Sequence, residues 1–107
     1  MYELPLNRRI MRFYNLPKII DDLELELHEA STKSKVEEID YKIADCKVEY
    51  YKVKNALKQL TDEERELLEL KYEMNVSYRL LGEHYGVSPN VLNKRVFKIM
   101  GMLGKLI

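Results

Sequence analysis

Several residue types are scarce in this sequence of 107 residues, which has four glycines, three prolines, one cysteine and no tryptophan. A single cysteine, Cys46, excludes an internal disulfide and favours a reducing compartment. No apolar run is long enough to cross a membrane. Residues 1–20 contain several cations and lack the apolar segment of a secretory signal. We therefore expect a cytoplasmic protein that has no membrane contact.

Charge is plentiful but uneven along the chain. The 18 basic and 18 acidic residues cancel. Residues 62–73 nevertheless hold six acids and two cations, whereas residues 77–107 hold five cations and one acid. A basic C-terminal third beside an acidic segment would direct one positive face at a polyanion without making the whole molecule adhere to it.

Apolar residues recur in the N-terminal half at alternating steps of three and four. In the longer segment they are Val36, Ile39, Ile43, Cys46, Tyr50, Val53, Leu57 and Leu60. This heptad pattern predicts a helix of about 37 Å at 1.5 Å per residue. Ser34-Lys35-Val36-Glu37 matches a capping box and predicts where that helix begins. Cys46 lies within the apolar seam, so we interpret it as a small buried hydrophobic residue.

An earlier segment repeats the pattern at Leu16, Ile20, Leu23, Leu27 and Ala30. Pro17 suits the first turn of this earlier helix, and the polar residues 31–34 suit the bend of a hairpin. We therefore expect residues 1–60 to form a coiled-coil-like helical hairpin.

The predicted hairpin has arms of unequal length, which leaves Tyr50, Val53 and Leu57 without cover from the shorter arm. A second chain would cover them, so we expect a homodimer through residues 1–60. Alternatively, residues 6–15 or the C-terminal helices fold against them within one chain.

Capping signals divide the remaining residues into short helices. Thr61 and Glu64 form a capping box that opens a helix to about Met74. Ser77 caps a helix over residues 78–85, and Gly86 suits a left-handed corner. Ser88 then caps the last helix, with a proline in its first turn.

The last two helices have the pattern of a helix-turn-helix. An inner face is predicted at Leu92, Val96, Ile99 and Leu103, and Leu81 and Tyr85 face inward from the helix before it. Gly82 would permit close approach of the two backbones, and Val87 would fill the corner. The outer face carries amides and cations, which suit base edges and phosphates in a major groove. The expected DNA-binding residues are Ser77, Arg79, Ser88, Asn90, Asn93, Lys94, Arg95 and Lys98.

Within this set, we expect Asn90, Asn93 and Lys94 to contact base edges and Lys98 to contact phosphate. Phe97 lies on the same outer face. The alternative is a three-helix core whose outer face is simply solvated. The predicted fold class is thus all-α, with a hairpin over residues 1–60 and a helix-turn-helix module over residues 61–107.

Residues 56–103 resemble region four of the sigma-70-type factors. The matching positions are Glu64, Arg65, Leu68, Tyr72, Ser77, Tyr78, Leu81, Gly82, Gly86, Val87, Ser88, Leu92, Arg95 and Val96. The resemblance implies binding to a promoter-like element in the major groove, with RNA polymerase as a further partner. Leu80 stands where that family usually has an acid, which predicts that this face is covered.

A helical hairpin followed by such a module resembles the small phage-encoded late-gene activators of Gram-positive bacteria, the ArpU-like and RinA-like regulators. The resemblance implies a transcriptional regulator of phage or prophage origin. One alternative is a sigma-like adaptor or decoy that binds RNA polymerase through the acidic residues 62–73. Another is a packaging protein that resembles small terminase subunits.

Residues typical of catalysis are not grouped in this sequence. His28 and His84 lack partners at metal-ligand spacing, and neither a phosphate-binding glycine loop nor a nucleophile-base pattern occurs. We expect no enzymatic activity, no metal and no cofactor.

Overall fold

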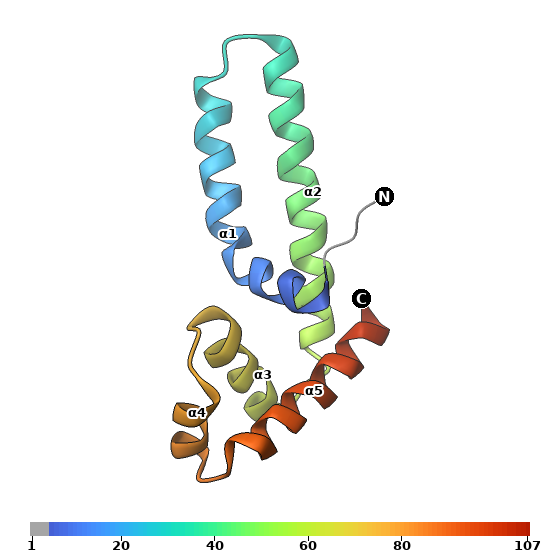
Figure 1. The fold of residues 1–107 in the computed structure, drawn as a ribbon. Helices are drawn as coiled ribbons and strands as arrows, with labels where there is room; N and C mark the ends of the chain where they lie inside the picture. Colours follow the sequence, from blue (N-terminus) through green and yellow to red (C-terminus); the bar gives the residue numbers. More distant parts are fainter. Residues whose placement is uncertain (1–4) are drawn as a thin grey trace.

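The computed structural model describes residues 5–107, and its regular elements are all helical (Figure 1). They are α1 (Leu6–Glu29), α2 (Lys33–Leu57), α3 (Asp62–Leu68), the π-helical segment η1 (Glu69–Glu73), α4 (Tyr78–Tyr85) and α5 (Pro89–Leu106). The all-α class is therefore confirmed. No helix in the described range is both long and apolar enough to cross a membrane. Residues 1–4 of the predicted hairpin lie outside the described residues.

Helices α1 and α2 form a long hairpin whose arms are nearly equal, at 24 and 25 residues. Thr32 is the N-cap of α2, and its hydroxyl accepts a hydrogen bond from the Lys35 amide at 3.2 Å. The predicted start at the Ser34 capping box is therefore wrong by two residues. The earlier cap at Thr32 satisfies a free amide two residues sooner, so Ser34 becomes part of the helix.

Helix α1 begins at Leu6, so the prediction that Pro17 lies in its first turn is also wrong. Pro17 lies inside α1 and its side chain is exposed. A proline there removes one helical hydrogen bond and commonly kinks the helix. Figure 1 shows the first turns of α1 running across the lower part of α2, at an angle to the rest of the hairpin.

These first turns of α1 cover the part of α2 that was expected to lack an intrachain partner. Val53 is fully buried and Leu57 is nearly so. The ring of Phe13 stacks on that of Tyr50 with centroids 5.1 Å apart. Residues 6–15 thus supply the cover within one chain. The reason given for a homodimer, an uncovered inner seam, is therefore wrong.

A single hydrophobic core joins the lower hairpin to the C-terminal helices. Ile10 and Phe13 from α1 and Val53 from α2 belong to the same buried cluster as Leu68 and Leu92. The turn between α2 and α3 lies at the predicted boundary, but apolar contacts continue across it. The position of α5 is therefore determined by both parts of the chain.

Candidate nucleic-acid interface

The corner between α4 and α5 is built from three local signals that the sequence displays. The Ser77 hydroxyl accepts a hydrogen bond from the Leu80 amide, and the Ser88 hydroxyl accepts one from the Val91 amide, each at 3.3 Å. Between them, Gly86 has φ +68°, a left-handed conformation that side chains with a Cβ rarely adopt. The predicted caps and the glycine corner are confirmed.

Gly82 permits the close approach that makes this corner tight. A Cβ atom at this position would lie 2.7 Å from the carbonyl oxygen of Val87. The Val87 amide also donates a hydrogen bond to the Gly82 carbonyl oxygen at 3.1 Å. The backbone after α4 therefore folds directly against α4, and this contact sets the direction in which α5 leaves the turn.

Helix α5 has the two faces that its spacing predicts. Leu92 and Leu103 are fully buried, and Val96 and Ile99 are 3% exposed. Asn90, Asn93, Lys94 and Lys98 are exposed. The described part of this helix contains no acidic residue. One side of α5 therefore offers amides and cations to solvent in a cation-rich surface.

Phe97 is the residue of this outer face that sequence reasoning placed there without giving it a role. Its side chain is 81% exposed, the largest exposed fraction among the exposed large hydrophobic residues of the range 5–107. It lies one helical turn after Asn93 and beside Lys98. An exposed aromatic ring at this position gives the surface a further group that can contact a partner.

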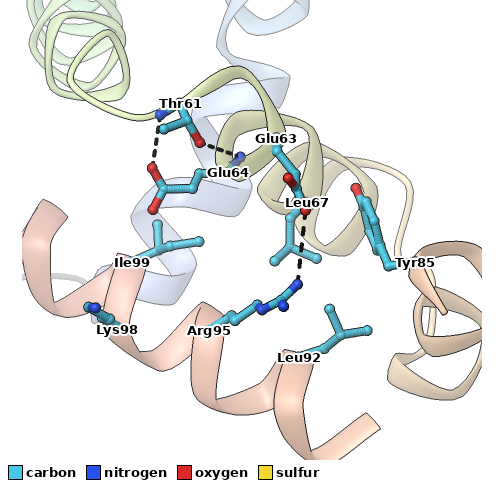
Figure 2. A pocket seen from close by; sticks show the side chains of 9 residues that line it. All are labelled: Thr61, Glu63, Glu64, Leu67, Tyr85, Leu92, Arg95, Lys98 and Ile99. Atoms are coloured by element: carbon cyan, nitrogen blue, oxygen red, sulfur yellow. Dashed lines mark hydrogen bonds and ion pairs between the residues drawn. The ribbon is translucent and has the colours of Figure 1, made fainter. Parts of the chain in front are cut away.

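Arg95 lies on a different flank of α5 from Asn93. Its guanidinium is 3.9 Å from a carboxylate oxygen of Glu63 on α3, and both side chains are about half or more exposed. Figure 2 shows Arg95 reaching toward Glu63, with Lys98 further along the same helix. An ion pair this exposed contributes little stability. The structure therefore places Arg95 in the cleft between α3 and α5, which Lys98 also lines, and not in the groove that Asn93 lines.

The cleft between α3 and α5 has a volume of about 310 Å³ and is lined partly by Arg95, Leu67 and Tyr85. The Tyr85 hydroxyl is buried and has no hydrogen-bond partner within residues 5–107. Burial, reinforced by the nearby Glu66 carboxylate, raises the pKa of Tyr85 to about 12. The phenol therefore stays neutral here at physiological pH. The predicted capping box at Thr61 forms one edge of this cleft (Figure 2) and is confirmed.

A second groove, of about 340 Å³, lies on the Asn93 side of α5 and brings in residues that sequence reasoning missed. Asn7 from the start of α1 and Tyr78 from α4 line it together with Asn93. The Lys71 ammonium lies 4.3 Å from the centroid of the Tyr78 ring, which places one more cation near the start of α4. Only the folding back of α1 brings Asn7 here, so no local pattern could have indicated it.

The start of α4 carries the remaining predicted residues. Ser77 and Arg79 are both exposed there. Leu80, which was expected to be covered, is 47% exposed, so that expectation is wrong. It lies in the first turn of α4, on a surface that no described element covers.

Comparisons with protein-family models, with curated proteins and with solved structures found no match for this chain. The geometry of the described residues therefore carries the functional argument. Within residues 5–107, no cluster of His, Cys, Asp and Glu has an arrangement that could hold a metal ion.

Proposed function

We propose that this protein binds double-stranded DNA through α4 and α5 and regulates transcription from a promoter-like element, as a phage- or prophage-encoded regulator would. The observation that carries the proposal is the exposed face of α5 with its amides and lysines. That face begins immediately after a corner whose direction is set by Gly82 and Gly86. A tight corner followed by a helix whose outer face carries amides and cations and no acid matches the helix-turn-helix arrangement, in which the second helix lies in the major groove.

In this proposal the residues of α5 divide their roles. Asn90 and Asn93 use their side-chain amides to contact adenine, which offers one donor and one acceptor in the major groove. Lys94 contacts guanine O6 and N7, and Lys98 contacts phosphate. Phe97 lies against the methyl group of a thymine, the apolar feature of that groove.

The start of α4 contacts the DNA backbone. Ser77 and Arg79 are exposed at that end of the helix, where free amides and the helix dipole favour an anion. Phosphate contacts of this kind position a protein without reading sequence. Ser88, whose hydroxyl oxygen already accepts the capping hydrogen bond, retains a hydroxyl proton that it can donate to phosphate.

Arg95 has a conditional role in this proposal. Its exposed pairing with Glu63 is weak enough for a phosphate to replace the carboxylate. Arg95 then swings from the α3 side toward the backbone of the bound duplex.

The proposal is tested by selecting bound fragments from random duplexes and then measuring affinity for the selected site by fluorescence anisotropy. Asn93→Ala should cost about 1–3 kcal/mol on that site and relax base preference at one or two positions. Lys98→Ala should weaken all duplexes alike and lower the salt slope by about one unit. Lys33→Ala removes a charge of the same sign from the far end of the hairpin and serves as the control.

Binding that is equally tight in the parent, Asn93→Ala and Lys98→Ala proteins would contradict the assignment of this face. If the parent protein has no measurable affinity for any duplex, DNA binding itself is excluded. The salt dependence adds an independent check, because sequence-tolerant phosphate contacts weaken steeply as salt rises.

A second candidate function, a sigma-like adaptor or decoy for RNA polymerase, is favoured by the acids of α3. Asp62 and Glu63 are 97% and 69% exposed in their side chains. Their carboxylates form an acidic surface on the α3 side of the Arg95 cleft. This function would be supported if the protein co-sediments with RNA polymerase and binds no duplex. Replacing both acids by their amides should then abolish the co-sedimentation. Ring-sized oligomers in solution would instead favour the terminase-like alternative.

A further inference from the structure

The outer face of α2 carries an apolar stripe that nothing in the described chain covers. Four residues form this outer stripe: Tyr41, Ala44, Val48 and Tyr51, spaced three, four and three apart. The side chains of Tyr41, Val48 and Tyr51 are 76%, 68% and 57% exposed. The stripe points away from the inner seam, where Ile39, Ile43 and Cys46 pack against α1. Helix α2 is therefore apolar on two sides, and only one of them packs against another element of residues 5–107.

The charges beside the stripe are segregated along the helix. Asp40 and Asp45 lie before Cys46, whereas Lys52 and Lys58 lie after it. None of these four residues makes an ion pair within residues 5–107. Neighbouring charges are already paired, Lys33 with Glu37 and Lys47 with Glu24 on α1. One half of the surface thus has free acids and the other half has free cations.

We propose that the outer stripe binds a second copy of this chain, with the two α2 helices antiparallel. In that orientation the half of each surface that carries the free acids lies beside the half of the other copy that carries the free lysines. A parallel pair would place like charges together, so the charges select the orientation. The same surface is used on both copies, as a two-fold dimer requires.

The spacing of the stripe fits an antiparallel pair centred near residue 46. Tyr41 then opposes Tyr51 of the other copy, and Ala44 opposes Val48. A small residue facing a larger one lets two helices approach closely while their side chains interdigitate. The tyrosines contribute large apolar area with few rotatable bonds.

This dimer uses a different face from the one that the heptad pattern first indicated, because α1 already fills the inner seam. A stripe of only four side chains per copy belongs to the smallest class of specific interfaces, below about 1,200 Å² in total. We therefore expect a reversible dimer that forms in the micromolar range.

Sedimentation equilibrium across the micromolar range tests the proposal with the full chain. The parent protein should shift from one-chain to two-chain mass as its concentration rises. Val48→Asp should weaken this association by at least about tenfold, because it places a carboxylate at the centre of the interface. Leu25→Asp is the matched control, since Leu25 is 64% exposed on α1 and lies outside the stripe. It should leave the association unchanged.

Charge exchange tests the orientation. Replacing Asp40 and Asp45 together by lysine should weaken the dimer, because both halves then carry positive charge. Replacing Lys52 and Lys58 by aspartate in the same variant should restore the dimer. The acidic and basic halves have then changed places and are again complementary. Far-UV circular dichroism of each variant verifies that the helices are intact.

A mass of one chain at every concentration overturns the proposal. Equal association in the Val48→Asp and Leu25→Asp proteins also overturns it, as does failure of the four-residue exchange to restore the dimer. These measurements contain no DNA, so their outcome is independent of whether α5 binds a duplex.

Discussion

Replacing Gly82 by alanine tests whether close packing of the backbone determines the α4–α5 corner. The added Cβ would lie 2.7 Å from the Val87 carbonyl oxygen and 3.5 Å from Cδ of Pro89. The first distance is well inside van der Waals contact. The obstructing atom belongs to the backbone and is held by the hydrogen bond from the Val87 amide to Gly82. The corner must therefore open to accept the methyl group.

The expected loss is the difference between two effects. Adding a carbon atom to a tightly packed site typically costs about 1–3 kcal/mol. Alanine is better than glycine within a helix by about 0.5–1 kcal/mol, which offsets part of that cost. We expect Gly82→Ala to lower the free energy of unfolding by about 1–2 kcal/mol, equivalent to a fall in Tm of about 5–10 °C for a chain of this size.

Gly101→Ala provides the matched control for this substitution. Gly101 lies in α5 with normal helical φ, and the space around its Cβ position is open for 4 Å. It should show only the gain in helix propensity, with a Tm a few degrees above that of the parent. Thermal unfolding followed by circular dichroism compares the two variants. If Gly82→Ala unfolds at or above the temperature of Gly101→Ala, the backbone contact does not constrain the corner.

Three further substitutions test the capping, the core and the buried phenol. Ser88→Ala should lower the free energy of unfolding by about 1 kcal/mol because α5 loses its N-cap; an unchanged urea midpoint would show that the cap is dispensable. Val53→Asp should abolish cooperative unfolding, because it buries an unpaired charge under α1; a melting curve like that of the parent would contradict this burial. Tyr85→Phe should be neutral or stabilising by up to about 1 kcal/mol, because the hydroxyl it removes lacks a partner within the described residues. The folded-state pKa of Tyr85, about 12, lies above the ordinary 10, so the unfolded chain ionises first. The free energy of unfolding should therefore fall between those pH values, and Tyr85→Phe should make the fall shallower. If the free energies of unfolding of the two proteins, measured by urea titration at pH 10 and above, fall equally with pH, that cause is refuted.

Sequence alone determined the features that depend on a few consecutive residues. The caps at Thr61, Ser77 and Ser88 form as expected, because each hydroxyl bonds to an amide three residues later. The left-handed Gly86 and the division of α5 into a buried and an exposed face follow from equally local rules. Most of the candidate site lies on α5, so most of it could be predicted.

Only the tertiary structure decided where α1 begins and what it covers. Pro17 is a local signal for a helix start, yet the chain continues as a helix through it back to Leu6. Burial of Ile10 and Phe13 against the lower part of α2 provides more free energy than the proline costs. The same folding brings Asn7 to the groove that Asn93 also lines, and the packing of α3 on α5 turns Arg95 toward Glu63. These contacts join residues far apart in the sequence. Their free energy arises only when the core closes, so periodicity and capping could not reveal them.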